Sequence, residues 1–416
     1  MKRIFAIALL LVSLNTNAQE TSSKVKIFYD CQTSCYQTFM KQNLPEVEFV
    51  RDRNFADAHI MITSETNGSG GQTFHLEFFG QNDYKAIQEK YSFATNTDMT
   101  TEQKRKMMLK YLKLGLLKFW VKNGLVDKLD LNIKSEKTKK EEKDPWNKWV
   151  FRISANGWFN GSSNSSSSNI NTSISAKQTK ENHKYYFSMN YGRSDNMYKF
   201  GAQKIFSKTE WLSASASDIL SINEHWSYGF FTGISQSLYS NYKISTYLKT
   251  GLEYDIFPYK VSSTKSIVFG AKLGANYYKY YEKTVYNKLN EFLWKADLSI
   301  SGSVVKKWGS LNLTTYYSTY LHNAKLNSFG FNAGTNIRIV KGLNFRINGA
   351  YSVTHNKINI AAGNLSLEET LLQQKELQSG YNYYASVGLS YSFGSIYNTI
   401  VNPRFTSGGG GRTYYF

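Results

Sequence analysis

Apolar and polar residues alternate along most of the chain after residue 148. In residues 343–354, for example, Leu343, Phe345, Ile347, Gly349 and Tyr351 are separated by single, mostly polar residues. A period of two is typical of a β-strand, in which successive side chains point to opposite faces. Several of these segments exceed ten residues, the length that a tilted membrane-spanning strand needs. The pattern therefore predicts spanning strands rather than the shorter strands of a soluble sandwich.

Twelve such segments follow one another, and bacterial single-chain barrels have an even number of strands. They are residues 148–161, 168–179, 183–193, 208–222, 225–238, 242–257, 266–280, 291–307, 310–321, 328–340, 343–355 and 382–394. Ten or fourteen strands are alternative counts, since residues 196–207 could pair with a neighbour. We therefore expect an antiparallel transmembrane β-barrel within residues 146–405.

The connections between these segments are of two kinds. One set is mostly tight, at residues 179–183, 222–226, 258–266, 306–310 and 340–344, whereas the other includes the longer stretches 194–207, 281–290 and 356–381. Short periplasmic turns and longer outer loops are the asymmetry of outer-membrane barrels. The asymmetry places both chain termini in the periplasm.

The residues before 134 have a different pattern. Short alternating segments predict strands at 25–29, 47–51, 58–63, 73–79 and 91–94, and helices are expected at 33–42 and 101–123. Thr100 and Gln103 have the spacing of a capping box, and Met108, Leu112 and Phe119 belong to an apolar stripe with helical spacing. We predict a small α/β domain over residues 19–133, followed by a charged linker at 134–145. The lysine-rich side of its long helix is a candidate surface for a periplasmic or cell-wall partner.

The N-terminus has the features of a secretory signal. Lys2 and Arg3 precede a short apolar run, and Ala18 ends a plausible cleavage site, so residues 1–18 are predicted to be removed. Beyond the signal the sequence contains no apolar run of eighteen residues, so a membrane would have to be crossed by strands. Residues 406–416 read as a flexible glycine-rich tail.

Composition and net charge limit the classes of function that the protein can have. Aromatic residues make up 16% of the chain, with 31 Tyr, as expected if they form girdles at two membrane interfaces. The formal net charge is +19, which in an exported protein points to lipid headgroups, anionic glycans or acidic solutes rather than to nucleic acid. We expect no enzymatic activity, cofactor or metal.

Two groups of residues in the N-terminal domain are candidates for local chemistry. Cys31 and Cys35 are the chain's only cysteines, and in an oxidising compartment they are expected to form a disulfide, a redox dithiol being the alternative. Asp52, Asp57 and His59 cluster in the segment RDRNFADAH. They suggest a metal site, but we favour an aspartate cap and a surface histidine.

Several segments resemble outer-membrane β-barrel proteins of the Bacteroidota type. They are the signal ending in NAQE, the segment GLEYDIFPY at 251–259 and the strand YYASVGLSYSFG at 383–394. The chain is also similar to the salt-induced outer-membrane-protein family of unknown function. The resemblance implies an outer-membrane location, contact with lipid and insertion by the barrel-insertion machinery. Either Phe393 or Phe416 would serve as the C-terminal insertion signal.

The inward positions of the predicted barrel suggest a function. They include the cations Arg152, Lys177, Lys249, Lys272, Lys295, Arg338 and Arg346, against the acids Glu253 and Asp297. Rings of basic residues favour anions, so we predict a narrow pore for small anionic solutes, with 356–381 as its constriction and a short helix from about 366 within it. The alternative is a non-transporting structural or assembly barrel whose periplasmic domain docks a partner. A third hypothesis, a hydrolase, would use His322 and His355 at the outer rim with Glu368 or Glu369.

Overall fold

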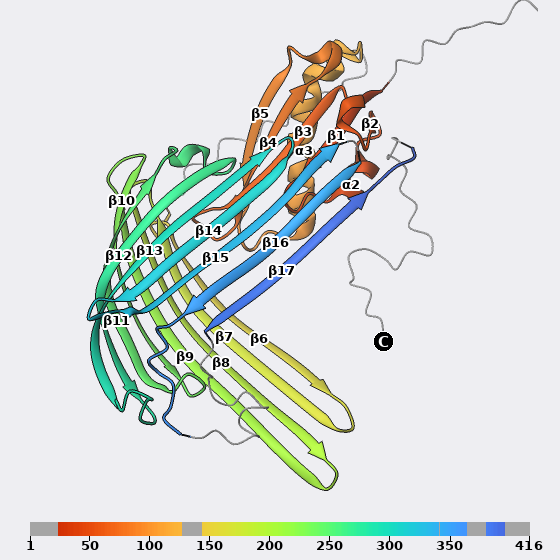
Figure 1. Cartoon of the computed structure of the whole chain (residues 1–416). Helices are drawn as coiled ribbons and strands as arrows, with labels where there is room; N and C mark the ends of the chain where they lie inside the picture. Colours follow the sequence, from red (N-terminus) through yellow and green to blue (C-terminus); the bar gives the residue numbers. More distant parts are fainter. Residues whose placement is uncertain (1–23, 127–143, 341, 364–379, 396–416) are drawn as a thin grey trace, which may run out of the picture.

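The computed structural model describes residues 24–126, 144–340, 342–363 and 380–395. Within these ranges the chain forms a five-stranded sheet with helices, followed by a twelve-stranded sheet (Figure 1). The predicted signal peptide, most of the linker, the predicted short helix in the outer loop and the glycine-rich tail lie outside the described residues.

The N-terminal domain, residues 24–126, alternates strands and helices. Its elements are β1 (Val25–Cys31), α2 (Gln37–Asn43), β2 (Val47–Phe49), η1 (Arg53–Phe55), β3 (Ala58–Thr66), β4 (Gln72–Gly80), η2 (Asn82–Tyr84), β5 (Gln88–Ala94) and α3 (Thr101–Lys122). The sheet order is β2-β1-β3-β4-β5, with β1 parallel to β2 and β3, and β4 antiparallel to β3 and β5. The predicted capping box of Thr100 and Gln103 is confirmed at the start of α3.

One face of this sheet packs against α2 and α3. Alternate residues of the strands, such as Ile27, Ile60 and Leu76, are fully buried with Met108 and Leu112 of α3 in one hydrophobic core. The other face carries the intervening residues, and it points toward the twelve-stranded sheet. The period-two pattern therefore gives this domain two different faces, one for its own core and one for the junction.

Gly115 lies where α3 crosses the sheet. A Cβ atom at this position would lie 2.1 Å from Cζ of Phe78, a fully buried ring. Gly115→Ala is therefore expected to destabilise the domain by about 1–3 kcal/mol through overpacking, although alanine is the better helix former. Amide hydrogen exchange along α3 in the whole protein measures this change. Leu114→Ala, at an exposed neighbouring position, is the control, and slower exchange in Gly115→Ala would contradict the expectation.

The second sheet is an antiparallel meander. Its strands are β6 (Trp149–Gly161), β7 (Ser165–Thr179), β8 (His183–Phe200), β9 (Gln203–Ser221), β10 (Trp226–Ser237), β11 (Tyr242–Asp255), β12 (Lys265–Tyr280), β13 (Asn290–Lys306), β14 (Gly309–Tyr320), β15 (Asn323–Val340), β16 (Leu343–Thr354) and β17 (Tyr381–Tyr391). Each strand pairs with the next one in the sequence, so all twelve predicted strands are confirmed. β6 and β17 are edges that do not pair with each other, and the sheet is a curved, open trough (Figure 1).

The prediction of an outer loop at residues 194–207 is wrong. β8 continues to Phe200 and β9 begins at Gln203, and the two extensions pair with each other, for example Asp195 opposite Lys208. The reversal is tight because Gly201 adopts a φ of +62°, a conformation that glycine reaches without strain. The segment thus satisfies its backbone hydrogen bonds by lengthening an existing hairpin.

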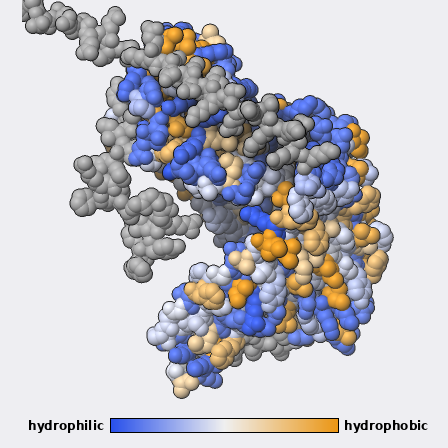
Figure 2. Space-filling model, turned by 180° about the vertical axis from the view of Figure 1, so that it is seen from behind, coloured by the Kyte–Doolittle hydropathy of each residue, from blue (hydrophilic) through white to orange (hydrophobic). Residues whose placement is uncertain are grey.

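The outward face of the twelve-stranded sheet is apolar. Its exposed residues include Ile234, Leu248, Leu252, Phe292 and Leu298. Figure 2 shows apolar residues gathered over the outside of the sheet, with hydrophilic residues toward its ends. Within the described ranges, no helix is both long and apolar enough to span a membrane.

Candidate functional site

The inward face of the sheet, opposite the apolar one, carries all seven predicted cations. Residues that pair directly across antiparallel strands share a face. Lys249 is paired with Gly274, which is paired with Lys295, and Asp297 is paired with Lys272. The same register places Arg338 and Arg346 on this face through β15 and β16, and Arg152 and Lys177 through β6 and β7. The predicted acid Glu253 faces the same way.

Three lysines and one aspartate form a cluster at the middle of this face. Lys249 Nζ lies 2.6 Å from Asp297 Oδ2, and Lys295 Nζ lies 3.8 Å from Asp297 Oδ1. Lys249 and Asp297 belong to β11 and β13, so the pair reaches across β12, as expected on the concave side of a curved sheet. Lys272 Nζ lies 3.9 Å from the centre of the Phe231 ring. It forms no ion pair within the described residues, although its charge interacts with that of Glu253 on β11. The cluster therefore keeps an excess of positive charge.

Residues 355–363, here called the strap, follow β16 and lie across the inward face. The Asn356 amide donates to the Ser318 and Ser328 hydroxyls, at 3.2 and 3.1 Å. Ile358 is buried in a hydrophobic cluster with Tyr278, Tyr280 and Tyr320. These partners belong to β12, β14 and β15, so the strap runs over neighbouring strands from its origin on β16.

The far end of the strap is tied to the connections on either side of β11 and β12. The amide of Asn241 donates to the Asn359 carbonyl at 3.0 Å, and the amide of Asn359 donates to the Ser240 carbonyl at 3.1 Å. Beyond it, the Val285 amide donates to the Ile360 carbonyl at 2.8 Å. The strap therefore covers the tyrosine cluster at the end of the inward face opposite the N-terminal domain. Residues 364–379 of the predicted constriction lie outside the described residues, and the constriction stays a prediction.

The opposite end of the inward face meets the N-terminal domain. Arg338, near the end of β15, forms a two-pronged ion pair with Asp30 of β1, a fully buried carboxylate. Asp30 Oδ2 also lies 2.9 Å from Nε2 of the fully buried His59. The prediction of a surface His59 is wrong, because the domain's second sheet face is covered at this point.

The charge states of Asp30 and His59 follow from their burial and from the residues that they contact. Burial by itself would raise the pKa of Asp30, but hydrogen bonds from Arg338 and His59, with the positive charge of Arg338, hold it at about 2. Burial lowers the pKa of His59 against the opposing influence of Asp30. The junction therefore contains an ionised aspartate and a neutral histidine at pH 7.

Further contacts join the domain to the tight turns of the meander. Lys307 Nζ, between β13 and β14, lies 3.8 Å from the centre of the Phe79 ring, and Arg53 Nη1 donates to the Lys307 carbonyl at 3.0 Å. Ser262 donates to Glu65 at 3.2 Å. Lys177 Nζ, near the end of β7, donates to the Asn67 carbonyl at 3.3 Å. The domain therefore sits over the turn end of the sheet, as Figure 1 also shows.

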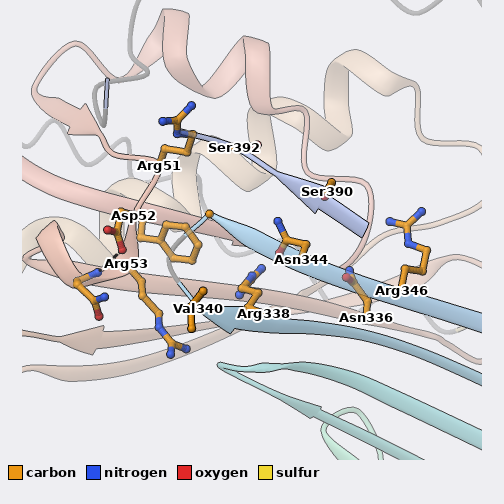
Figure 3. A pocket seen from close by; sticks show the side chains of 13 residues that line it. Arg51, Asp52, Arg53, Asn336, Arg338, Val340, Asn344, Arg346, Ser390 and Ser392 are labelled. Carbon is orange, nitrogen blue, oxygen red and sulfur yellow. Dashed lines mark hydrogen bonds between the residues drawn. The ribbon is translucent and has the colours of Figure 1, made fainter. Parts of the chain in front are cut away.

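A cleft of about 580 Å³ lies between the domain and strands β15–β17 (Figure 3). Its lining includes four arginines and one acid: Arg51, Arg53, Arg338, Arg346 and Asp52. Amide and hydroxyl groups add further hydrogen-bonding groups, from Asn336, Asn344, Ser390 and Ser392. Arg51 and Arg53 were not among the site residues predicted from the sequence. The signal that could have identified them is the repeated basic residue in RDR, between β2 and β3.

The other candidate residues are placed as follows. Cys31 and Cys35 are joined in a disulfide at the end of β1. Asp52 accepts a hydrogen bond from the Asn54 amide at the start of η1, and Asp57 accepts one from the Lys26 amide. No group of three or more potential metal ligands occurs within the described ranges.

Two of the residues named for the hypothetical rim hydrolase, His322 and His355, lie within the described ranges. His322 follows β14 and His355 follows β16, and no hydrogen bond or ion pair links these two histidines in the part of the chain that is described. Glu368 and Glu369 lie outside the described residues.

Comparisons with known proteins give weak similarities. No family model matches the chain, and no curated protein matches it. Among solved structures, a NanC porin is 11% identical over 58% of this chain and 99% of its own, with a TM-score of 0.28. The translocator domain of the autotransporter NalP from Neisseria meningitidis is 11% identical over 68% of this chain and 98% of its own, with a TM-score of 0.25. At such scores these similarities carry no argument about function, and the resemblance to the Bacteroidota and salt-induced families stays a prediction.

Proposed function

We propose that this protein is an outer-membrane β-barrel that conducts small anions, with its N-terminal domain on the periplasmic side. The apolar outward face supports the membrane location. Residues such as Leu248 and Phe292 expose 64% and 60% of their surface, and they recur on neighbouring strands. Contiguous apolar patches of this kind are rare on soluble monomers, and a bilayer would cover them. A membrane barrel also requires β6 and β17 to be paired, since unpaired backbone groups are costly in lipid.

The observation that carries the anion preference is the charge of the inward face. Lys249 and Lys295 share a single carboxylate, Asp297, and Lys272 interacts with Glu253, so three lysines stand against two acids. Low-dielectric walls around a narrow aqueous path focus the field of such charges. A solute crossing this level would therefore meet a net positive potential. Arg338 contributes less than predicted from the sequence, because Asp30 neutralises it.

Reversal potentials in a planar bilayer with a salt gradient test this proposal. Wild-type protein is expected to prefer chloride over potassium. Lys272→Gln removes an unpaired cation and should shift the reversal potential toward cation preference, whereas Asp297→Asn removes the shared acid and should shift it the opposite way. Lys199→Gln, at the tip of the β8–β9 hairpin, is the control. Cation preference in the wild type, or equal shifts in the control, would contradict the pore.

The orientation gives a separate prediction. The N-terminal domain covers the end of the sheet opposite the long β16–β17 connection, so that end should face the periplasm. A cysteine at Asn164, in the β6–β7 turn at the other end, should react with an impermeant maleimide on intact cells, in protein lacking the native cysteines. A cysteine at Glu181, in the β7–β8 turn, should react only after the outer membrane is opened. The reverse pattern would contradict the orientation.

A second function is favoured by the covering of both ends of the inward face. The strap lies over the tyrosine cluster, and the N-terminal domain lies over the turn end. If these elements close the lumen, the protein is a structural or assembly barrel whose periplasmic domain docks a partner. Absence of conductance in the wild type and in strap variants alike would favour this alternative.

A further inference from the structure

The cleft between the two domains is lined by more positive than negative side chains, and the proposed pore assigns no role to this excess. Arg51, Arg53 and Arg346 form no ion pair within the described residues, whereas Arg338 is already paired with Asp30. The one acid in the lining, Asp52, is a buried side chain that accepts a backbone hydrogen bond within its own turn. Three guanidinium groups therefore border one cavity without a carboxylate of their own.

The position of these arginines matters as much as their number. Arg51 and Arg53 belong to the loop and short helix after β2, and Arg346 belongs to β16. Figure 3 shows these three side chains around the cleft, contributed from both of its walls. Their like charges repel across the cavity, and an anion between them would remove that repulsion. Asn344, Ser390 and Ser392 add neutral polar groups to the lining of the cleft.

We propose that this cleft is a binding site for a small organic anion with two or more carboxylate or phosphate groups. The planar fork of a guanidinium matches the oxygens of either group with two parallel hydrogen bonds. A ligand with two anionic ends can engage Arg346 at one end and Arg51 or Arg53 at the other. The cavity, at about 580 Å³, has the size of a typical small-molecule site.

Such a ligand would connect the two domains. Its contacts to Arg51 and Arg53 are on the N-terminal domain, and its contact to Arg346 is on the twelve-stranded sheet. Binding would add a further link to the Asp30–Arg338 pair and the other contacts between the domains, and would favour the docked arrangement. The site goes beyond the proposed pore, because binding at the turn end requires no conductance.

Calorimetric titration of the whole protein in detergent tests the site, with citrate, pyrophosphate and inorganic phosphate as probes. Saturable binding of citrate or pyrophosphate is expected, with inorganic phosphate weaker because it spans less of the cleft. Preference between citrate and pyrophosphate distinguishes a carboxylate from a phosphate ligand. Arg346→Gln and Arg51→Gln should each weaken binding roughly 10- to 100-fold, the usual loss for a charge-assisted hydrogen bond.

Two variants serve as controls for the binding experiment. Arg152→Gln removes an inward arginine outside the cleft and should leave the affinity unchanged. Arg346→Lys keeps the charge but not the planar guanidinium, and should restore only part of the affinity that Arg346→Gln loses. Equal loss in Arg152→Gln, or no binding of any probe, would overturn the site. Binding without conductance would leave the site standing and defeat the pore, and anion-selective conductance without binding would do the reverse.

Discussion

Replacing Arg338 by glutamine is expected to lower the melting temperature of the N-terminal domain by more than about 10 °C. The substitution leaves the carboxylate of Asp30, which is fully buried, with the neutral side chains of His59 and Gln32 as its remaining partners in the described part of the chain, and with no cation beside it there. Leaving one member of a buried ion pair uncompensated costs about 3–5 kcal/mol, a large share of the stability of a domain of this size. Scanning calorimetry of the whole protein in detergent measures the shift.

Arg346→Gln is the matched control for this experiment. Arg346 is another inward arginine close to the junction, and it has no ion pair within the described residues, so its loss should change the melting temperature little. The double variant Asp30→Asn with Arg338→Gln should be more stable than the sum of its single variants predicts, since neither partner then retains a buried charge. Additive effects would contradict direct coupling between the two side chains.

The same pair gives a pH dependence with a definite sign. Asp30 has a pKa of about 2 in the folded protein, below the ordinary value of 3.8. Its ionised form therefore stabilises the junction above the ordinary value, and this contribution is lost as the pH falls from 3.8 to about 2. The difference in melting temperature between wild type and Asp30→Asn should shrink over this interval. A difference that grows on acidification would contradict the assignment.

Replacing Ile358 by aspartate is expected to raise the single-channel conductance roughly two-fold or more, by displacing the strap from the inward face. Ile358 is buried against Tyr278, Tyr280 and Tyr320. An unpaired carboxylate among these rings would cost several kcal/mol. The hydrogen bonds that anchor the strap contribute only about 1 kcal/mol each, so the strap should leave the cluster rather than bury the charge.

Val285→Asp controls for the added charge. Val285 is half exposed in the connection between β12 and β13, beside the end of the strap, so a carboxylate there needs no rearrangement. Its conductance should stay near that of the wild type. Equal conductance in Ile358→Asp and wild type would show that the strap does not constrict the pore, and equal increases in both variants would assign the effect to surface charge.

The sequence by itself determined the strands and their faces. Alternation with a period of two identifies each strand of the meander, and the same parity places residues such as Lys249 and Arg346 on the inward face. The capping box at Thr100 is also local, since its partners are three residues apart. These features could be predicted because each depends on a few neighbouring residues and on strand or helix geometry.

Only the tertiary structure decided what the inward residues contact. Asp30 and Arg338 are 308 residues apart, and Asn241 and Asn359 are 118 apart. No local period relates such residues, so the sequence could not show that Arg338 is neutralised, that His59 is buried, or which residues hold the strap. The cleft likewise exists because two separately folded sheets bring Arg51 and Arg346 to one cavity. Local periodicity fixes which face a side chain occupies, whereas its charge balance depends on distant segments that meet only on folding.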